Sequence, residues 1–105
     1  MEINHNKLVR DNIPDIIKAD GRTPVVRRLT NCEYINALHK KLLEEVNEYL
    51  DNNSIEELAD ILEVVSAIAK ANGYSDEDLE KCRENKRLQN GGFEKRLFLE
   101  KVMPS

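Results

Sequence analysis

The chain has 105 residues, a length that fits one domain with a modest hydrophobic core, so we expect residues 1–105 to form a single domain that would gain stability from self-association. Hydrophobic residues make up 40% and charged residues 34%, a balance that favours amphipathic helices over a β-sandwich. The 16 Lys and Arg against 20 Asp and Glu give a net charge of −4, which argues against a non-specific nucleic-acid binder.

Nothing in the sequence directs the chain into or across a membrane. No apolar run approaches the roughly 20 residues of a membrane helix, and the first five residues lack the apolar stretch of a signal peptide. Cys32 and Cys82 form no CxxC pattern, so we expect reduced thiols that pack as small hydrophobes in a cytoplasmic protein. His5 and His39 share no ligand spacing with each other or with the cysteines, so no zinc site is expected.

The N-terminal third predicts a short helix and then a strand. Pro14 suits the first turn of a helix over about residues 14–19, which Gly21 would end. The β-branched run at 25–29 predicts a strand, and the segment 97–102 predicts a second one. Two isolated strands usually pair. Because a lone two-stranded ribbon is marginal in water, this ribbon should lie against helices.

Three capping boxes mark the starts of three long helices. The first helix should run from residue 31 to about residue 50, with a turn at 51–53, while Asn and Gly residues should end the second helix at 72–73 and the third at 90–92. The predicted fold is all-α: an antiparallel bundle of about three long helices plus the short N-terminal helix and the small ribbon. The paired capping residues are Thr30 with Glu33, Ser54 with Glu57, and Ser75 with Asp78.

Certain acids occupy positions where a helix should be apolar. Glu45 falls on the stripe of Leu38, Leu42 and Tyr49, and Glu48 follows one turn later on the same face.

The next helix repeats this pattern. Glu57 and Asp60 share a stripe with Val64 and Ala67, although the main apolar face of that helix lies elsewhere. This helix is therefore expected to pack against more than one neighbour.

A short loop makes these two helices antiparallel neighbours, so four carboxylates should converge: Glu45, Glu48, Glu57 and Asp60. Unpaired charges in a half-buried space cost several kcal/mol each, and a hard divalent cation would remove that cost. Oxygen ligands favour Mg²⁺ or Mn²⁺ over zinc. The alternative is that Glu57 only completes the Ser54 capping box and that Glu48 is a solvated surface acid, as Glu44, Glu56 and Glu63 would be.

Several cations are candidates for binding substrate phosphates. Lys86 continues the stripe of Leu79 and Cys82 and should point inward, where a lysine needs a partner. It could pair with the acids or reach phosphates. By default, the other cations would be solvated. These other candidates are Lys7, Arg10, Arg87, Lys95 and Arg96.

Glu45-x-x-Glu48 and Glu57-x-x-Asp60 resemble the ExxE…ExxD signature of the MazG-like, all-α nucleotide pyrophosphohydrolases. A wider match involves KLVRDNIP at 7–14, KLLEEVNE at 41–48, ELAD at 57–60 and GGFEKR at 91–96. These segments resemble a compact subgroup of house-cleaning pyrophosphatases, often labelled phosphoribosyl-ATP pyrophosphohydrolase-like. The resemblance runs from residue 7 to 102. One departure is that only eight residues separate Glu48 from Glu57, fewer than in typical MazG proteins.

The resemblance implies a mechanism and a function. The four acids would bind Mg²⁺, which holds a nucleoside triphosphate and activates a water. The water attacks phosphorus, and a monophosphate and pyrophosphate leave. One of the four acids, or Glu44, would act as the base. The substrate would be a non-canonical or deoxy nucleotide, and the protein a homodimer or homotetramer. The alternatives are phosphoribosyl-ATP hydrolysis and, from another class, a non-catalytic helical dimerisation or protein-interaction module.

Overall fold

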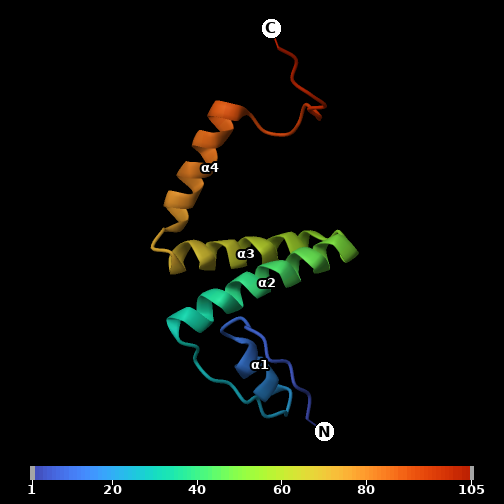
Figure 1. Ribbon diagram of the computed structural model, residues 1–105. Helices are drawn as coiled ribbons and strands as arrows, with labels where there is room; N and C mark the ends of the chain where they lie inside the picture. The colour runs from blue at the N-terminus through green and yellow to red at the C-terminus, as the bar shows by residue number, and fades with distance from the viewer. Residues whose placement is uncertain (1, 105) are drawn as a thin grey trace.

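The computed structural model describes residues 2–104, and this part of the chain folds into four helices and no strands. They are α1 (Ile13–Ala19), α2 (Asn31–Asn52), α3 (Ile55–Ala71) and α4 (Asp76–Asn90) (Figure 1). The predicted all-α class and the order of one short and three long helices are confirmed. No described helix is both long and apolar enough to cross a membrane.

The first and third of the predicted capping boxes are complete. The Thr30 hydroxyl accepts a hydrogen bond from the backbone N–H of Glu33, whose carboxylate accepts one from the backbone N–H of Thr30. Ser75 and Asp78 make the same reciprocal pair at the start of α4. Each box satisfies two backbone donors that a helix start leaves free, so both helices begin where the sequence predicts.

A tight turn joins α2 to α3 into an antiparallel hairpin. α2 continues to Asn52, two residues beyond its predicted end, and Asn53 alone reverses the chain with a left-handed φ of 54°. Its backbone N–H donates to the Tyr49 carbonyl at 2.7 Å, and Ser54 caps α3 immediately afterwards. The predicted three-residue turn is therefore reduced to one residue. Because the turn is so short, it determines which residues of α2 lie beside which residues of α3.

The predicted β-ribbon is wrong. Segments 25–29 and 97–102 carry no strand pairing, and Figure 1 shows them near opposite ends of the molecule. The turn at Gly73 (φ 88°) sends α4 away from the hairpin, and the C-terminal segment goes with it. Val25 is 96% exposed and Leu97 is 86% exposed, so neither segment has the helical surface that a two-stranded ribbon needs.

The core of the chain is small and lies between α2 and α3. Its buried apolar residues are Leu38, Val64 and Ala69, whereas α4 buries none. The expected inward stripe of α4 is therefore absent in this chain: Lys86 is exposed. Cys32 and Cys82 are also exposed, in contrast to the prediction that they pack inside. The radius of gyration is 18.7 Å, against about 13 Å for a compact domain of this length.

Candidate metal centre

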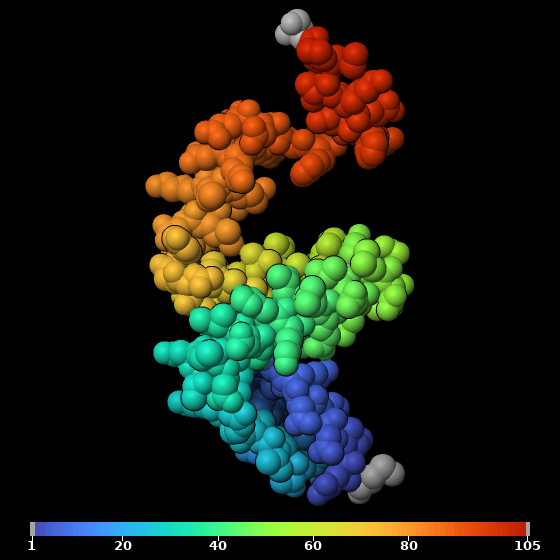
Figure 2. Space-filling view, viewed as in Figure 1, coloured from blue at the N-terminus to red at the C-terminus, as the bar shows by residue number. Residues whose placement is uncertain are grey.

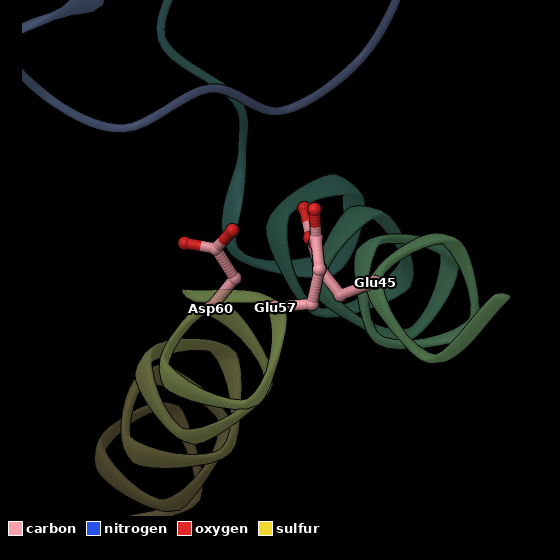
Figure 3. Close-up of side chains that lie close together, drawn as sticks. All are labelled: Glu45, Glu57 and Asp60. Atoms are coloured by element: carbon pink, nitrogen blue, oxygen red, sulfur yellow. The ribbon is translucent and has the colours of Figure 1, made fainter. Parts of the chain in front are cut away.

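Three of the four predicted acids meet on one side of the hairpin. Glu45 comes from α2, and Glu57 and Asp60 come from successive turns of α3. One carboxylate oxygen from each lies within 4.8 Å of the other two. Figure 3 shows the Glu45 and Glu57 carboxylates side by side, with Asp60 next to them and the N-terminal segment passing over the group. The antiparallel hairpin thus brings together residues that its two halves carry separately.

Glu45 is the buried member of this cluster. Only 6% of the surface of residue Glu45 is exposed, and its Oε2 has no hydrogen-bond partner in the described part of the chain. Its Oε1 pairs with the Lys41 ammonium at 3.2 Å. Burial raises the pKa of Glu45 above its ordinary value, against the effect of Lys41, and the charges of Glu48 and Asp60 raise it further. A full negative charge on Glu45 is therefore costly without another cation.

The Glu57 carboxylate does not make the capping interaction that would account for its presence at this position without a metal. Its backbone N–H donates to the Ser54 hydroxyl at 3.3 Å, but its carboxylate does not return to the Ser54 backbone. The second capping box predicted from the sequence is therefore only half formed. The Glu57 carboxylate joins the acid cluster instead, where its Oε2 is buried and finds no partner among the described residues.

Two cations of the N-terminal segment, Lys7 and Arg10, pair with acids of the hairpin, whereas the sequence predicted them to bind substrate phosphates. Arg10 donates a hydrogen bond to Oδ1 of Asp60, and the Lys7 ammonium lies 3.5 Å from Glu44. Glu44 also pairs with Lys41 at 3.5 Å. These ion pairs hold the N-terminal segment across the open side of the hairpin.

Lys41 is a site residue that was not among the candidates predicted from the sequence. Its Nζ bridges Glu44 and Glu45 from one turn earlier on α2, and the i, i+4 spacing to Glu45 was the available signal. Burial alone would lower the pKa of Lys41, but the hydrogen bond to Glu45 and the nearby charges outweigh burial and raise it. Lys41 is therefore a permanent positive charge beside the cluster.

The fourth predicted ligand, Glu48, lies one turn beyond Glu45 and is half-buried. It is not among the three acids whose oxygens come within 4.8 Å of one another, but its charge contributes to the raised pKa of Glu45.

The remaining predicted cations are far from the acids within one chain. They lie on α4 and the segment after it, which leave the hairpin at the opposite side from the N-terminal segment (Figure 1). Arg87 pairs with Glu94 at 3.8 Å. All four residues are exposed: Lys86, Arg87, Lys95 and Arg96.

The donor set suits a hard divalent cation. All the candidate ligand atoms are carboxylate oxygens, and two of them are buried without a hydrogen-bond partner in the described range. Buried polar atoms are nearly always satisfied in proteins, so a pair of orphaned carboxylate oxygens calls for a ligand. Arg10 and Lys41 neutralise part of the cluster but leave these two atoms unsatisfied.

Comparison with known proteins identifies one uncharacterised relative. A protein of Mycolicibacterium smegmatis (strain ATCC 700084 / mc(2)155) is 60% identical over 42 residues. The matched stretch covers 40% of this chain and 43% of the relative, so the likeness spans less than half of each protein. No family model matches the chain, and no solved structure matches it.

Proposed function

We propose that this protein is a Mg²⁺-dependent nucleotide pyrophosphohydrolase of the MazG-like kind, which cleaves a nucleoside triphosphate to a monophosphate and pyrophosphate. The observation that carries the proposal is the pair of buried, unpartnered oxygens of Glu45 and Glu57 beside Asp60. The proposed substrate class, a non-canonical or deoxy nucleotide, follows from the resemblance of the motifs around these residues.

In this proposal Glu45, Glu57 and Asp60 hold the divalent cation, and Glu48 completes the set from the next turn of α2. A bound Mg²⁺ or Mn²⁺ would neutralise phosphate charge and make a water more acidic. The Glu44 carboxylate lies next to Glu45 in the chain and is positioned by Lys7 and Lys41. It is the proposed acceptor of the proton that the attacking water loses.

Arg10 has the chemistry to exchange one anion for another. A guanidinium binds phosphate and carboxylate with the same forked geometry, so Arg10 can leave Asp60 for a phosphate oxygen. Its side chain is about half exposed, which leaves it accessible to an incoming nucleotide. Arg10 would thus neutralise Asp60 before the substrate binds and hold phosphate afterwards.

The burial of Glu45 favours an enzyme over a module that only dimerises. A helix selected only for dimerisation gains nothing from a buried carboxylate with an unsatisfied oxygen, because the group costs free energy. Phosphoribosyl-ATP hydrolysis would use the same acids and differs in its base and ribose contacts. It is therefore included among the substrates of the assay.

The test is a product assay with purified protein, Mg²⁺ and individual nucleotides. The panel includes common, deoxy and modified triphosphates and phosphoribosyl-ATP, and chromatography separates the products. We expect monophosphate and pyrophosphate from at least one substrate, with loss of turnover in EDTA. A protein that hydrolyses none of the panel, and that shows no Mg²⁺ or Mn²⁺ binding by calorimetry, would contradict the proposal.

Neighbouring acids on α3 give matched variants for this assay. Glu57→Gln removes a cluster carboxylate, whereas Glu56→Gln makes the same change at an exposed position one residue earlier. We expect Glu57→Gln to reduce kcat/KM by at least a hundredfold and Glu56→Gln to leave it within about twofold, since removing one group that stabilises transition-state charge costs about 10²–10³. Equal activities of the two variants would exclude Glu57 from the site.

A further inference from the structure

The α2–α3 hairpin is apolar and exposed on the side opposite its acids. Leu58 and Leu62 stand two residues either side of Asp60, and Leu43 stands two residues before Glu45. Because two residues turn a helix by about 200°, these leucines lie across the helices from the carboxylates. We call this surface the outer apolar face. It consists of five exposed residues: Leu43, Leu50, Ile55, Leu58 and Leu62.

These residues fall at matching levels on the two helices. Leu50 and Ile55 lie close to the turn at Asn53, on either side of it, while Leu43 and Leu62 lie about ten residues from that turn. In an antiparallel hairpin, residues equally far from the turn lie beside each other. The outer apolar face is therefore a continuous strip rather than scattered side chains.

The C-terminal part of the chain buries none of its described residues against the rest of the chain. All residues from 71 to 104 are exposed. We call residues 92–104 the C-terminal arm. Figure 2 shows α4 and the arm, in orange and red, curving away from the hairpin and leaving a wide hollow between them. The exposed apolar residues of the arm are Phe93, Leu97, Phe98, Leu99, Val102 and Met103.

The total exposed area is far above that of a folded monomer. The chain exposes 9974 Å², whereas a monomeric protein of 12.1 kDa exposes about 6,000 Å². The excess is several times the roughly 800 Å² that each partner buries in a standard interface. It fits the large, apolar interfaces of obligate oligomers, in which whole elements of one chain lie on another.

The two uncovered apolar surfaces indicate that the covering partner is another copy of the same chain. One chain contains both an exposed apolar strip on the hairpin and an apolar C-terminal arm that does not reach it. Charge does not oppose this pairing, because α4 and the arm together, residues 76–104, carry seven Lys or Arg and seven Asp or Glu. Two copies can satisfy both surfaces at once around a twofold axis, the commonest symmetry of oligomers.

We propose that two copies of this chain assemble by exchanging their C-terminal arms, so that α4 and the arm of each copy lie on the outer apolar face of the other. The inner corner of the hollow, lined by Ala69, Tyr74, Leu79 and Cys82, becomes part of this interface. The inference uses residues on the side of the hairpin away from the acids and does not rest on the proposed enzymatic activity.

The first test is the mass of the full chain by analytical ultracentrifugation between about 1 and 100 μM. We expect a species of twice the 12.1 kDa chain mass. Phe98→Ser, in the arm, and Leu62→Gln, on the outer apolar face, should each weaken association at least tenfold. Val25→Ser changes an equally exposed apolar residue outside the proposed interface and should leave association within about twofold. A single-chain mass at 100 μM would overturn the proposal, as would equal weakening by Val25→Ser and Phe98→Ser.

The second test remains decisive even if a variant fails to fold. Unlabelled and ¹⁵N-labelled wild-type proteins are mixed in urea, refolded together and treated with a zero-length carbodiimide cross-linker. Arm exchange predicts cross-links that join Lys95 or Lys101 to acids of the hairpin, with one light and one heavy peptide in half of the products. Arm-to-hairpin links that never combine light and heavy peptides would overturn the exchange.

Discussion

At the scale of single residues, the Glu45 carboxylate carries a cost that a divalent cation would relieve. Its pKa is raised by burial, so the folded state binds protons more tightly than the unfolded state. The contribution of this carboxyl to stability is present at low pH and is lost as pH rises through the raised pKa. At pH 7 and without divalent cations, Glu45→Gln should therefore increase the free energy of unfolding, by more than the roughly 0.5 kcal/mol of an ordinary surface substitution.

Urea unfolding followed by circular dichroism in EDTA measures this effect. Glu63→Gln, at an exposed position of α3, is the matched control and should change stability by less than about 0.5 kcal/mol. A Glu45→Gln protein less stable than wild type in EDTA would mean that the Lys41 pair outweighs the cost of burial.

Glu33 shows the opposite behaviour at the start of α2. The hydrogen bond from Arg27, together with those from Thr30, lowers the pKa of Glu33 from 4.5 to about 2. The stability that this carboxylate contributes is present above its ordinary pKa and is lost as pH falls through about 2. Between pH 5 and pH 2, Glu33→Gln should therefore lose less stability than wild type. Urea unfolding at a series of pH values tests this, and parallel stability curves for the two proteins would contradict it.

At the scale of the element, the hairpin depends on a single left-handed residue. Asn53 has φ 54°, where asparagine is tolerated but alanine is strained by about 1–2 kcal/mol. Asn53→Ala should therefore lower the free energy of unfolding by about 1 kcal/mol, whereas Asn53→Gly should be neutral within a few tenths. Equilibrium unfolding of both variants gives the comparison. Equal losses of stability in both variants would mean that Asn53 stabilises the hairpin through its side chain rather than through its backbone conformation.

Local signals in the sequence predict the helices well because caps act within a few residues. Thr30 and Ser75 mark helix starts by bonds to the third residue on, and Gly91 ends α4 by a positive φ of 82°. The two predicted strands are wrong because strands, unlike caps, depend on residues far away in the sequence. Strand pairing is a long-range contact, and strand propensity depends on the surface that the segment meets. The direction of the turn at Gly73 determines which surface the C-terminal segment meets, and residue type alone does not determine that direction.

The residues of the candidate site also divide into those with a local sequence signal and those placed by long-range contacts. Glu45 and Asp60 are predictable because an acid in an apolar stripe breaks a local periodicity. The i, i+4 spacing also gave Lys41 a local signal, but that spacing is as common on solvated faces as in buried sites. The contact of Arg10 with Asp60 joins residues 50 positions apart and depends on the path of the whole N-terminal segment. The distance of Lys86 from the acids depends likewise on where α4 goes.

At the scale of the whole molecule, arm exchange makes folding and association one process. If the arms are covered only in the assembled state, mass action links stability to protein concentration, and a hundredfold rise in concentration adds about 2.7 kcal/mol. For a cooperative unit of two chains, this corresponds to a rise in Tm of roughly 5 °C. Because the chain has no Trp, far-UV circular dichroism is the suitable probe, with scans at about 1 and 100 μM. Phe98→Ser should lower Tm most at the lower concentration, where the weakened assembly dissociates first. An identical Tm at both concentrations would mean that each chain folds alone, leaving its outer apolar face and arm uncovered, and would refute the coupling of folding to assembly.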